Sequence, residues 1–283
     1  MQAGNLNKDI PLEKHYSHLM SENEFAIIQK FVYESIGVNL TYDKSVMVAS
    51  RLAKRLRHYN LQKYGDYFQK VAADALPGEK QIVVDLLTTN ETSFFREPWH
   101  FDYLKEHVFP QFTREDAIKC WSAACSTGEE VYTLAMVLAD YFAGGNWSIV
   151  GSDINASVLD RAQRGHYSID ASSNIDDALL KRYCLRGFGP SDGMFTFDSG
   201  LKKHLSFRSN NLALPYTGGM IYDIVFLRNV LIYFDREIKD AVVNNIILSI
   251  KPGGYLFIGH SEALKGFEDK LELVAHTAYR KRK

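Results

Sequence analysis

The sequence has little cysteine, no excess of charge of either sign and no long apolar run. Cys120, Cys125 and Cys184 are its three cysteines, an odd number without the spacing of a disulfide framework. This excludes a small secreted fold held together by disulfides. The formal net charge is −1, so the chain as a whole is not an electrostatic binder of nucleic acid, and a charged partner would need a local patch.

The sequence also lacks a segment that would place it in a membrane. No run approaches the roughly 18 apolar residues that a spanning helix needs. The opening residues, MQAGNLNKDIPLEK, have no apolar core of the kind found in a signal peptide. We therefore expect a cytoplasmic protein without direct membrane insertion.

The hydrophobic pattern changes along the chain and predicts two domains. Ser21 and Glu24 predict a capping box, and apolar residues at helical spacing predict further helices up to residue 88. From residue 117, short apolar runs alternate with helical stretches, as in a parallel α/β sheet. We expect a helical domain over 1–88 and an α/β domain over 89–283. The predicted strands cover 118–123, 147–152, 205–208, 221–227, 255–259 and 271–279, and the helices cover 129–142, 156–164 and 236–250. A glycine-rich segment over about 165–208 predicts a small antiparallel β insertion.

The first predicted strand ends in a loop of small residues that leads directly into a helix. In a doubly wound sheet, a ligand sits above the carboxyl end of such a strand. The loop has one glycine, Gly128, so it lacks the G-x-G-x-x-G turn that holds a pyrophosphate. Glu129 and Glu130 follow, where a phosphate would need positive potential. They favour a cationic or zwitterionic nucleoside such as S-adenosylmethionine, although acids here also stabilise a helix N-terminus without a ligand.

Asp153 ends the second predicted strand. An acid at this place, about 20 residues past the loop, commonly accepts hydrogen bonds from the ribose hydroxyls. The alternative is that Asp153 caps the helix that follows. Together the two strand ends indicate a nucleoside site, but they do not separate a methyl donor from NAD.

Six motifs, in this order, resemble the chemotaxis receptor methyltransferases of the CheR type. They are TNETSFFRE (89–97), WSAACSTGEE (121–130), SDI (152–154), RGFGP (186–190), RNVLIYF (228–234) and KPGGYLFIGHSE (251–262). The resemblance extends over about residues 22–282. The sequence departs from the family at Val131, where proline is usual, and at Cys125, and neither change removes a polar contact.

The resemblance implies a small helical domain followed by a class I Rossmann-like methyltransferase domain that binds S-adenosylmethionine. The implied activity is the formation of glutamate γ-methyl esters on chemoreceptors, with S-adenosylhomocysteine as the product. Such esters tune adaptation in chemotaxis or in related signalling.

The resemblance also implies roles for individual residues. Arg96 and Tyr233 are expected nearest to the transferring methyl, as catalytic residues. Glu129, or alternatively Glu130, is expected to face the amino group of the cofactor, and Asp153 to hold its ribose. The other expected cofactor contacts are Asn90, Thr92 and Arg96 above the cofactor, Asn211 and Leu212 around the adenine, and Arg228 and Asn229 beneath the sulfonium.

This chemistry requires neither a general base nor a metal. A glutamate side chain has a pKa of about 4.3 and is already an anion near neutral pH. The protein has to align the reacting groups and exclude water, with Arg96 orienting the carboxylate and Tyr233 beside it. The nine histidines show no H-E-x-x-H pattern, and Cys120 and Cys125 lack partner ligands, so we expect no metal site. We expect His260 to be structural.

A basic helix face predicts how the substrate is selected. The segment 44–63 contains Arg51, Lys54, Arg55 and Arg57, and it has no acidic residue. Such a face is often only solvated, yet its single sign in a slightly acidic chain favours docking of an acidic helical partner. The resemblance implies that this partner is the cytoplasmic helical bundle of a chemoreceptor. In some members of the resembled family, the part that corresponds to the insertion, at 186–190, captures a receptor C-terminal peptide at a sheet edge. The resemblance leaves open whether this chain does the same. We expect a monomer.

Three other functions compete with this interpretation. A methyltransferase for nucleic acid or a small molecule would use the same pocket, but the sequence lacks an Asn-Pro-Pro-Tyr motif, and stacking aromatics do not interleave with the basic helix. A non-catalytic signalling module would keep the fold, and the intact set of candidate site residues argues against it. An NAD dehydrogenase is disfavoured by the loop with a single glycine.

Overall fold

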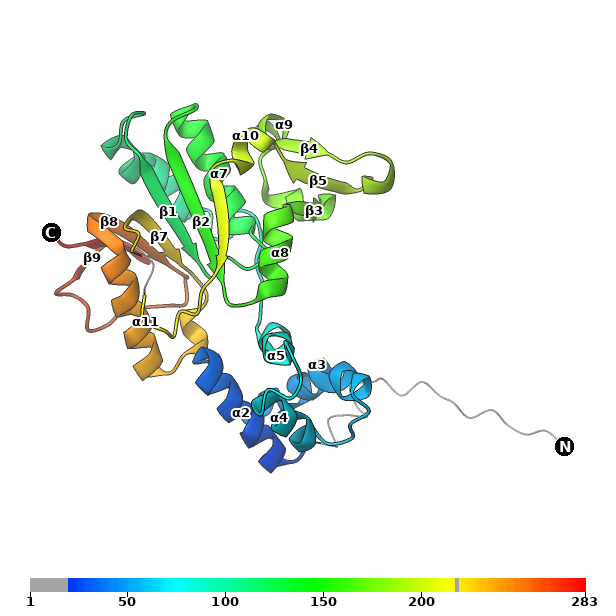
Figure 1. Ribbon diagram of the computed structural model, residues 1–283. Helices are drawn as coiled ribbons and strands as arrows, with labels where there is room; N and C mark the ends of the chain where they lie inside the picture. The colour runs from blue at the N-terminus through cyan, green and yellow to red at the C-terminus, as the bar shows by residue number, and fades with distance from the viewer. Residues whose placement is uncertain (1–19, 217–218) are drawn as a thin grey trace. The chain divides into compact units, whose positions relative to one another are not determined.

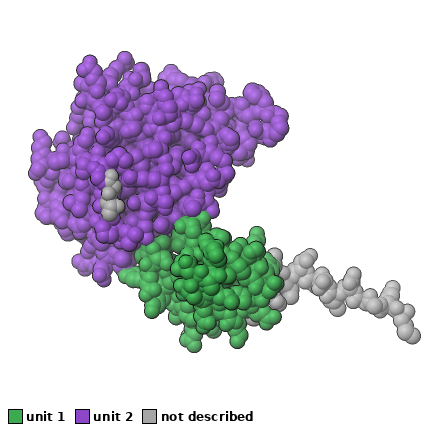
Figure 2. All heavy atoms as spheres, in the orientation of Figure 1, with its two compact units in different colours: residues 1–88 green, residues 89–283 purple. Residues whose placement is uncertain are grey.

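The computed structural model describes residues 20–216 and 219–283, and the chain divides into two compact units, 1–88 and 89–283 (Figure 2). The opening residues, in which we expected no signal peptide, lie outside the described ones. Among the described residues, no helix is both long and apolar enough to cross a membrane.

The described part of the first unit is helical. Its elements are α2 (Glu22–Ile36), the 3₁₀ turn η1 (Tyr42–Lys44), α3 (Ser45–His58), α4 (Tyr64–Ala72) and α5 (Glu79–Leu87). The predicted capping box begins α2, because the Ser21 side chain accepts from the Glu24 N–H and Glu24 accepts in return from the Ser21 N–H. Gly37 ends α2 in the left-handed region, at φ 74°. The apolar stripe of α3 is buried, as its helical spacing predicts.

A buried carboxylate, that of Glu79, joins α3, α4 and α5. The Arg55 guanidinium donates to both of its oxygens, at 2.7 and 2.6 Å. The Tyr59 and Tyr67 hydroxyls donate to it as well, at 2.9 and 2.6 Å. Burial by itself would raise the pKa of Glu79, but these donors, Arg55 first among them, hold it below its usual value. Arg55 is therefore a structural residue of this unit, although its position in the sequence suggested a docking residue.

Arg51 has a second structural contact on the same helix. Its Nη1 donates to the carbonyl oxygens of Leu86 and Thr88, at 3.1 and 2.9 Å, and so holds the end of α5. Lys54 and Arg57 are exposed. The predicted basic face therefore consists of two arginines that hold the unit together and two residues that are exposed to solvent.

The second unit contains a seven-stranded sheet with the order β6-β2-β1-β7-β8-β10-β9. The strands are β1 (Ile118–Ala123), β2 (Trp147–Asp153), β6 (Leu205–Ser209), β7 (Tyr222–Leu227), β8 (Ile250–Ile258), β9 (Leu271–Ala275) and β10 (Ala278–Lys281). Adjacent strands from β6 to β8 pair in parallel, and β10 pairs antiparallel with β8 and β9. This is the α/β architecture that the alternating pattern predicts. The run predicted as one strand over 271–279 is instead the hairpin of β9 and β10, since Thr277 turns at φ 55°.

Helices cover both faces of this sheet. Successive side chains of a strand point to opposite faces, so each strand contributes to two cores. Cys120 and Phe226 belong to a core on the side of α7 (Glu129–Phe142), and Trp121 and Val225 belong to a core on the side of α11 (Arg236–Ser249). The remaining elements of this unit outside the insertion are α6 (Trp99–Tyr103), the π-helical turn η2 (Leu104–Val108), η3 (Phe109–Gln111), α8 (Ala156–Arg164), α10 (Ser199–Lys202) and η6 (Leu231–Tyr233).

The segment between α8 and β6 contains the β insertion, which projects away from the large sheet (Figure 1). Its three short strands pair antiparallel in the order β3-β5-β4. Its elements are β3 (His166–Ser168), η4 (Ile169–Asn174), α9 (Asp177–Tyr183), β4 (Cys184–Arg186), η5 (Gly189–Ser191) and β5 (Met194–Phe197). Residues 205–208, which we also included in the range of the insertion, form β6 of the large sheet.

We expect the variant Glu79→Gln to lower the free energy of unfolding of the helical unit by about 3 kcal/mol, because Arg55 would lose its buried charge partner. Urea-dependent hydrogen exchange of peptides from α3 and α5 measures this unit within the full chain. The matched control is Glu34→Gln, which removes an exposed carboxylate 3.8 Å from Lys30 and should cost less than about 0.5 kcal/mol. Equal exchange in the two variants would contradict a stabilising role for Glu79.

Candidate functional site

The carboxyl ends of the parallel strands meet at one edge of the large sheet, and most of the predicted site residues follow these ends. The loops after β1, β2, β6, β7 and β8 all leave the sheet here. Ligands of open α/β sheets bind at this edge.

Backbone amides fix the loop between β1 and α7. The Ala124 and Cys125 N–H groups both donate to the Ser152 carbonyl, at 2.8 Å each. The Ser126 N–H donates to an Asp153 carboxylate oxygen at 2.9 Å. The loops after β1 and β2 therefore form one rigid structure.

Asp153 is buried at the end of β2, and its second oxygen accepts from the Asn155 N–H at 3.0 Å. The cap of α8 is Asn155, whose side chain accepts from the Val158 N–H at 3.1 Å. The alternative that Asp153 is the cap of this helix is therefore wrong.

Gly128 is required at the start of α7 for two reasons. Its φ is 97°, a value that residues with a side chain rarely adopt, and a Cβ would lie 2.9 Å from the Ala162 Cβ and 3.0 Å from the Tyr167 hydroxyl. The Tyr167 hydroxyl donates to the Thr127 carbonyl at 2.7 Å. Ser126 is also left-handed, at φ 48°. For a residue with a side chain, such as Ser126, this conformation costs about 1 to 3 kcal/mol, and residues of this kind cluster at functional sites.

The two acids at the start of α7 have different surroundings. Glu129 is buried and accepts from the Thr127 hydroxyl at 2.6 Å. Burial raises its pKa, because the hydroxyl only partly replaces lost water. Both oxygens of Glu130 are occupied, one by the Ser122 hydroxyl at 2.6 Å and the other by Arg228 at 3.0 Å. Glu129 is thus the acid whose charge has no cationic partner within ion-pair distance among the described residues.

Arg228 follows β7 and is buried, with 7% of its surface exposed. Its guanidinium pairs with Glu130 and also with Glu97, at 3.2 Å. It donates a further hydrogen bond to the Arg96 carbonyl. Burial would raise the pKa of Glu97, but Arg228 and two hydrogen bonds lower it below the usual value. Arg228 therefore joins three segments at this edge of the sheet.

Two further carboxylates at this edge of the sheet, Glu97 and Glu262, belong to the motifs at 89–97 and 251–262, and the sequence predicted no role for them. Glu97 accepts from the Asn229 amide at 3.3 Å and from the His260 N–H at 3.1 Å. Glu262 accepts from the backbone of Asn229 and of Leu231. A glutamate in a loop motif looks like a surface residue in the sequence, so only the fold shows these contacts.

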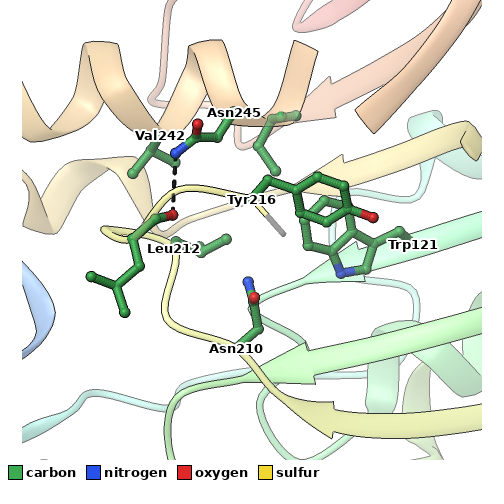
Figure 3. A pocket seen from close by; sticks show the side chains of 8 residues that line it. Trp121, Asn210, Leu212, Tyr216, Val242 and Asn245 are labelled. Carbon is green, nitrogen blue, oxygen red and sulfur yellow. Dashed lines mark hydrogen bonds between the residues drawn. The ribbon is translucent and has the colours of Figure 1, made fainter. Parts of the chain in front are cut away.

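A small pocket lies between the segment that follows β6 and helix α11 (Figure 3). Its lining includes Trp121, Asn210, Leu212, Tyr216, Val242 and Asn245. The Trp121 and Tyr216 rings lie 5.5 Å apart, and the Asn245 amide donates to the Leu214 carbonyl at 3.2 Å. Its cavity volume is about 10 Å³, which is room for about one water molecule. Aromatic, aliphatic and amide side chains line it.

Leu212 is the predicted cofactor residue that lines this pocket. The side-chain oxygen of Asn211 instead accepts from the Ala213 N–H at 3.1 Å. The pocket adjoins the end of β2, because the N–H of its lining residue Asn210 donates to the Asp153 carbonyl at 3.0 Å.

The other predicted residues lie on the segment after residue 88 and after β7. The Asn90 carbonyl accepts from the Ser126 hydroxyl at 2.9 Å, which joins this segment to the β1 loop. Arg96 is half-buried, and its Nη1 donates to the Glu91 carbonyl at 2.8 Å. Thr92 is half-buried, and half-buried Tyr233 ends the turn η6. The role of each in binding or catalysis stays a prediction.

A buried histidine, His100, supports this network from α6. Its Nε2 lies 3.0 Å from the Thr277 hydroxyl, and its ring packs against Phe226 and Phe257. Burial, and then the charge of Arg228, lower its pKa to about 3, so the ring is neutral.

Burial also raises the pKa of the Cys125 thiol well above its usual value. Within 20–216 and 219–283, no group of three His, Cys, Asp or Glu residues is placed to bind a metal.

Comparisons with known proteins cover both units. Residues 23–88 match the family described as "CheR methyltransferase, all-alpha domain", and residues 90–280 match "CheR methyltransferase, SAM binding domain". A chemotaxis protein methyltransferase of Escherichia coli (strain K12) is 37% identical over 263 residues, which cover 92% of this chain and 91% of the relative. Chemotaxis protein methyltransferase 2 of Pseudomonas aeruginosa is 35% identical, with 94% of each chain covered. The corresponding protein of Borreliella burgdorferi is 32% identical, with 93% and 95% covered.

We expect the stability of the second unit to fall by about 2 kcal/mol between pH 7 and pH 5 because of His100 alone. In the unfolded chain His100 takes up a proton below about pH 6.5, whereas in the folded state it stays neutral down to a pKa of about 3. The stabilisation is therefore present above pH 6.5 and is lost as the pH falls. Urea denaturation followed by tryptophan fluorescence measures it, because all three tryptophans lie in this unit.

The variant His100→Phe should lose this part of the pH dependence, whatever its stability at pH 7. The exposed His107 provides the control, since His107→Gln should keep the wild-type difference between the two pH values. An unchanged difference in His100→Phe would show that other groups cause it.

Proposed function

Because the chain belongs to the CheR methyltransferase family, we propose that it esterifies glutamate side chains of a chemoreceptor with the methyl group of S-adenosylmethionine. The observation that carries this proposal is the pair of buried carboxylates, Glu129 and Asp153, on the rigid loops after β1 and β2. We assign cofactor binding and chemistry to residues 89–283 and substrate recognition to residues 1–88. The products are a glutamate γ-methyl ester and S-adenosylhomocysteine.

The residues at the strand ends fit this cofactor. Glu129 would face the ammonium group, since its buried charge needs a cation, whereas Glu130 already pairs with Arg228. Asp153 would hold the ribose hydroxyls. The adenine ring would lie beside Leu212, where the pocket lining offers the aromatic faces of Trp121 and Tyr216. When bound, S-adenosylmethionine supplies a methyl group on a positively charged sulfur, which is a good leaving group.

The protein's own contribution is to hold the acceptor and exclude water. A glutamate acceptor is ionised near neutral pH and needs no base. Arg96 is suited to orient it, because the guanidinium offers a fork of donors. Its backbone carbonyl accepts from Arg228, and its Nη1 donates to the Glu91 carbonyl of the same segment. Pairing that is too tight would stabilise the ground state and slow transfer. Tyr233 would form the other side of this acceptor site.

The first unit would bind the acidic helical bundle of the receptor through Lys54 and Arg57. Both residues are exposed on α3, whereas Arg51 and Arg55 stabilise the unit. Long-range attraction between opposite charges speeds such an encounter. The proposed site of action is the cytoplasm, with the enzyme as a monomer.

The β insertion would provide a second contact with the receptor. Its strand β4 is at the edge of the small sheet, and Leu185 and Phe188 are exposed there. An edge strand can accept a further strand, with exposed apolar side chains for specificity. We propose that a receptor C-terminal peptide binds at this edge.

Incubation of the purified chain with methyl-labelled S-adenosylmethionine and a receptor cytoplasmic bundle tests the function. We expect label on the receptor that mild base releases as methanol, because esters hydrolyse and methylated amines do not. The variant Arg96→Ala should reduce transfer by about 100-fold, through loss of acceptor alignment, and should leave cofactor affinity nearly unchanged.

Arg114→Ala, at an exposed arginine of the same unit, is the matched control and should transfer at the normal rate. A label that resists base, or its absence, would overturn the proposed activity. Normal transfer by Arg96→Ala would remove only the role of Arg96.

We expect the double variant Lys54→Glu with Arg57→Glu to raise KM for the receptor by about tenfold at low salt, because attraction becomes repulsion. The affinity for cofactor should not change, and the effect should shrink as salt is added. Lys70→Glu, at an exposed lysine of α4, is the control. If KM were the same in all three proteins, α3 would not be the docking surface.

A further inference from the structure

The turn after β8 contains a carboxylate that is buried and bound by backbone amides. Glu262 is 6% exposed. One of its oxygens accepts from the Gly259 N–H at 2.7 Å and from the Asn229 N–H at 3.0 Å, and the other accepts from the Leu231 N–H at 2.8 Å. Two of these amides belong to the loop after β7, so one side chain joins two strand ends. A buried anion is costly unless hydrogen bonds replace its hydration, and these three amides do so.

The loop that Glu262 holds has an unusual backbone. Asn229 lies in the left-handed region, at φ 56°. After Val230, η6 makes one 3₁₀ turn that ends at Tyr233, whose N–H donates to the Val230 carbonyl at 3.2 Å. A left-handed residue followed by a tight turn persists only where the surroundings impose it. Glu262 provides this constraint through the amides at 229 and 231.

Gly259 shows how closely the two strand ends approach. A Cβ at this position would lie 2.6 Å from the Asn229 side-chain nitrogen and 2.8 Å from its backbone nitrogen. Real Cβ atoms do not come this close, so a side chain at 259 would push the loop away. The absence of a side chain at 259 and the carboxylate at 262 therefore act together to seat residues 229–231.

Glu97, which precedes this loop in the chain, also holds it, but through the side chains of the loop. It accepts from the Asn229 side-chain amide and pairs with Arg228. Glu97 thus binds side chains of the loop, and Glu262 binds its backbone. A change at Glu262 would free the turn that leads to Tyr233 and leave the Arg228 ion pairs in place.

We propose that Glu262 is a positioning residue for methyl transfer, which sets the backbone at 229–231 and, through the turn η6, the place of Tyr233. This inference rests on the proposed function in one respect, that Tyr233 borders the acceptor. The amide side chain of glutamine has the same length but only one acceptor oxygen, and its NH₂ group would face backbone N–H groups. At least one buried amide would lose its partner in Glu262→Gln.

Hydrogen exchange tests the positioning independently of any activity. In Glu262→Gln, at least one of the amides of Asn229 and Leu231 should exchange at least about tenfold faster than in the wild type, because these two amides bond different oxygens of Glu262 and glutamine keeps only one acceptor oxygen. The matched control is Glu268→Gln, an exposed glutamate that accepts from the Gly266 N–H at 3.1 Å. It should leave exchange at 229 and 231 unchanged. Wild-type exchange at both amides in Glu262→Gln would overturn the proposal.

Turnover then tests the consequence for catalysis. We expect kcat of Glu262→Gln to fall by about 10- to 100-fold, since a displacement of about 1 Å has this effect. The Kd for S-adenosylhomocysteine should change by less than about threefold. A merely structural role predicts instead that kcat, cofactor affinity and thermal stability decline together, or that kcat does not change, and either result would refute positioning.

A double-mutant cycle identifies the residue through which Glu262 acts. If it acts through Tyr233, adding Glu262→Gln to Tyr233→Phe should cause little further loss of kcat, and fully additive losses would contradict this route. A wild-type enzyme that binds cofactor but does not esterify a receptor would overturn the proposed function instead. The hydrogen-exchange comparison would still decide whether Glu262 seats the loop.

Discussion

The buried guanidinium of Arg228 is the constraint on which this site depends. Its ion pairs with Glu97 and Glu130 and its hydrogen bond to the Arg96 carbonyl join the end of β7, the start of α7 and the segment that carries Arg96. Removing a guanidinium from water is costly unless partners replace its hydration. Both Nη groups of Arg228 have such partners, which hold these three segments in one arrangement, whereas its buried Nε has none among the described residues. Two carboxylates around one cation also leave the site negative, which favours a positively charged ligand.

The loop after β1 adds a second constraint of a different kind. Backbone hydrogen bonds to Ser152 and Asp153 order it, and they hold Ala124 and Ser126 in left-handed conformations. A pre-organised loop loses little entropy on binding, and Glu129 is buried there with a raised pKa. In the proposed function, a bound cation would be the partner that the buried Glu129 carboxylate otherwise lacks.

The helical unit shows how basic residues of one helix divide their roles. Arg55 is used for the buried Glu79 and Arg51 for the end of α5, whereas Lys54 and Arg57 face solvent. The spacing of these residues along α3 is regular, and the difference between them comes from what packs against each turn. A charged face in a sequence therefore overstates the surface that is available to a partner.

The sequence by itself determined the two-unit organisation, the alternating α/β pattern, the capping box at Ser21 and the loop with a single glycine before Glu129, because these follow from local periodicity and backbone preference. It also placed Asp153 and Arg228 at strand ends. Only the tertiary structure decided that 271–279 is a hairpin, that Glu130 and not Glu129 pairs with Arg228, and that Glu97 and Glu262 hold the loop after β7. These contacts join residues up to 132 positions apart. Whether a charge finds a partner depends on which strand ends the sheet brings together.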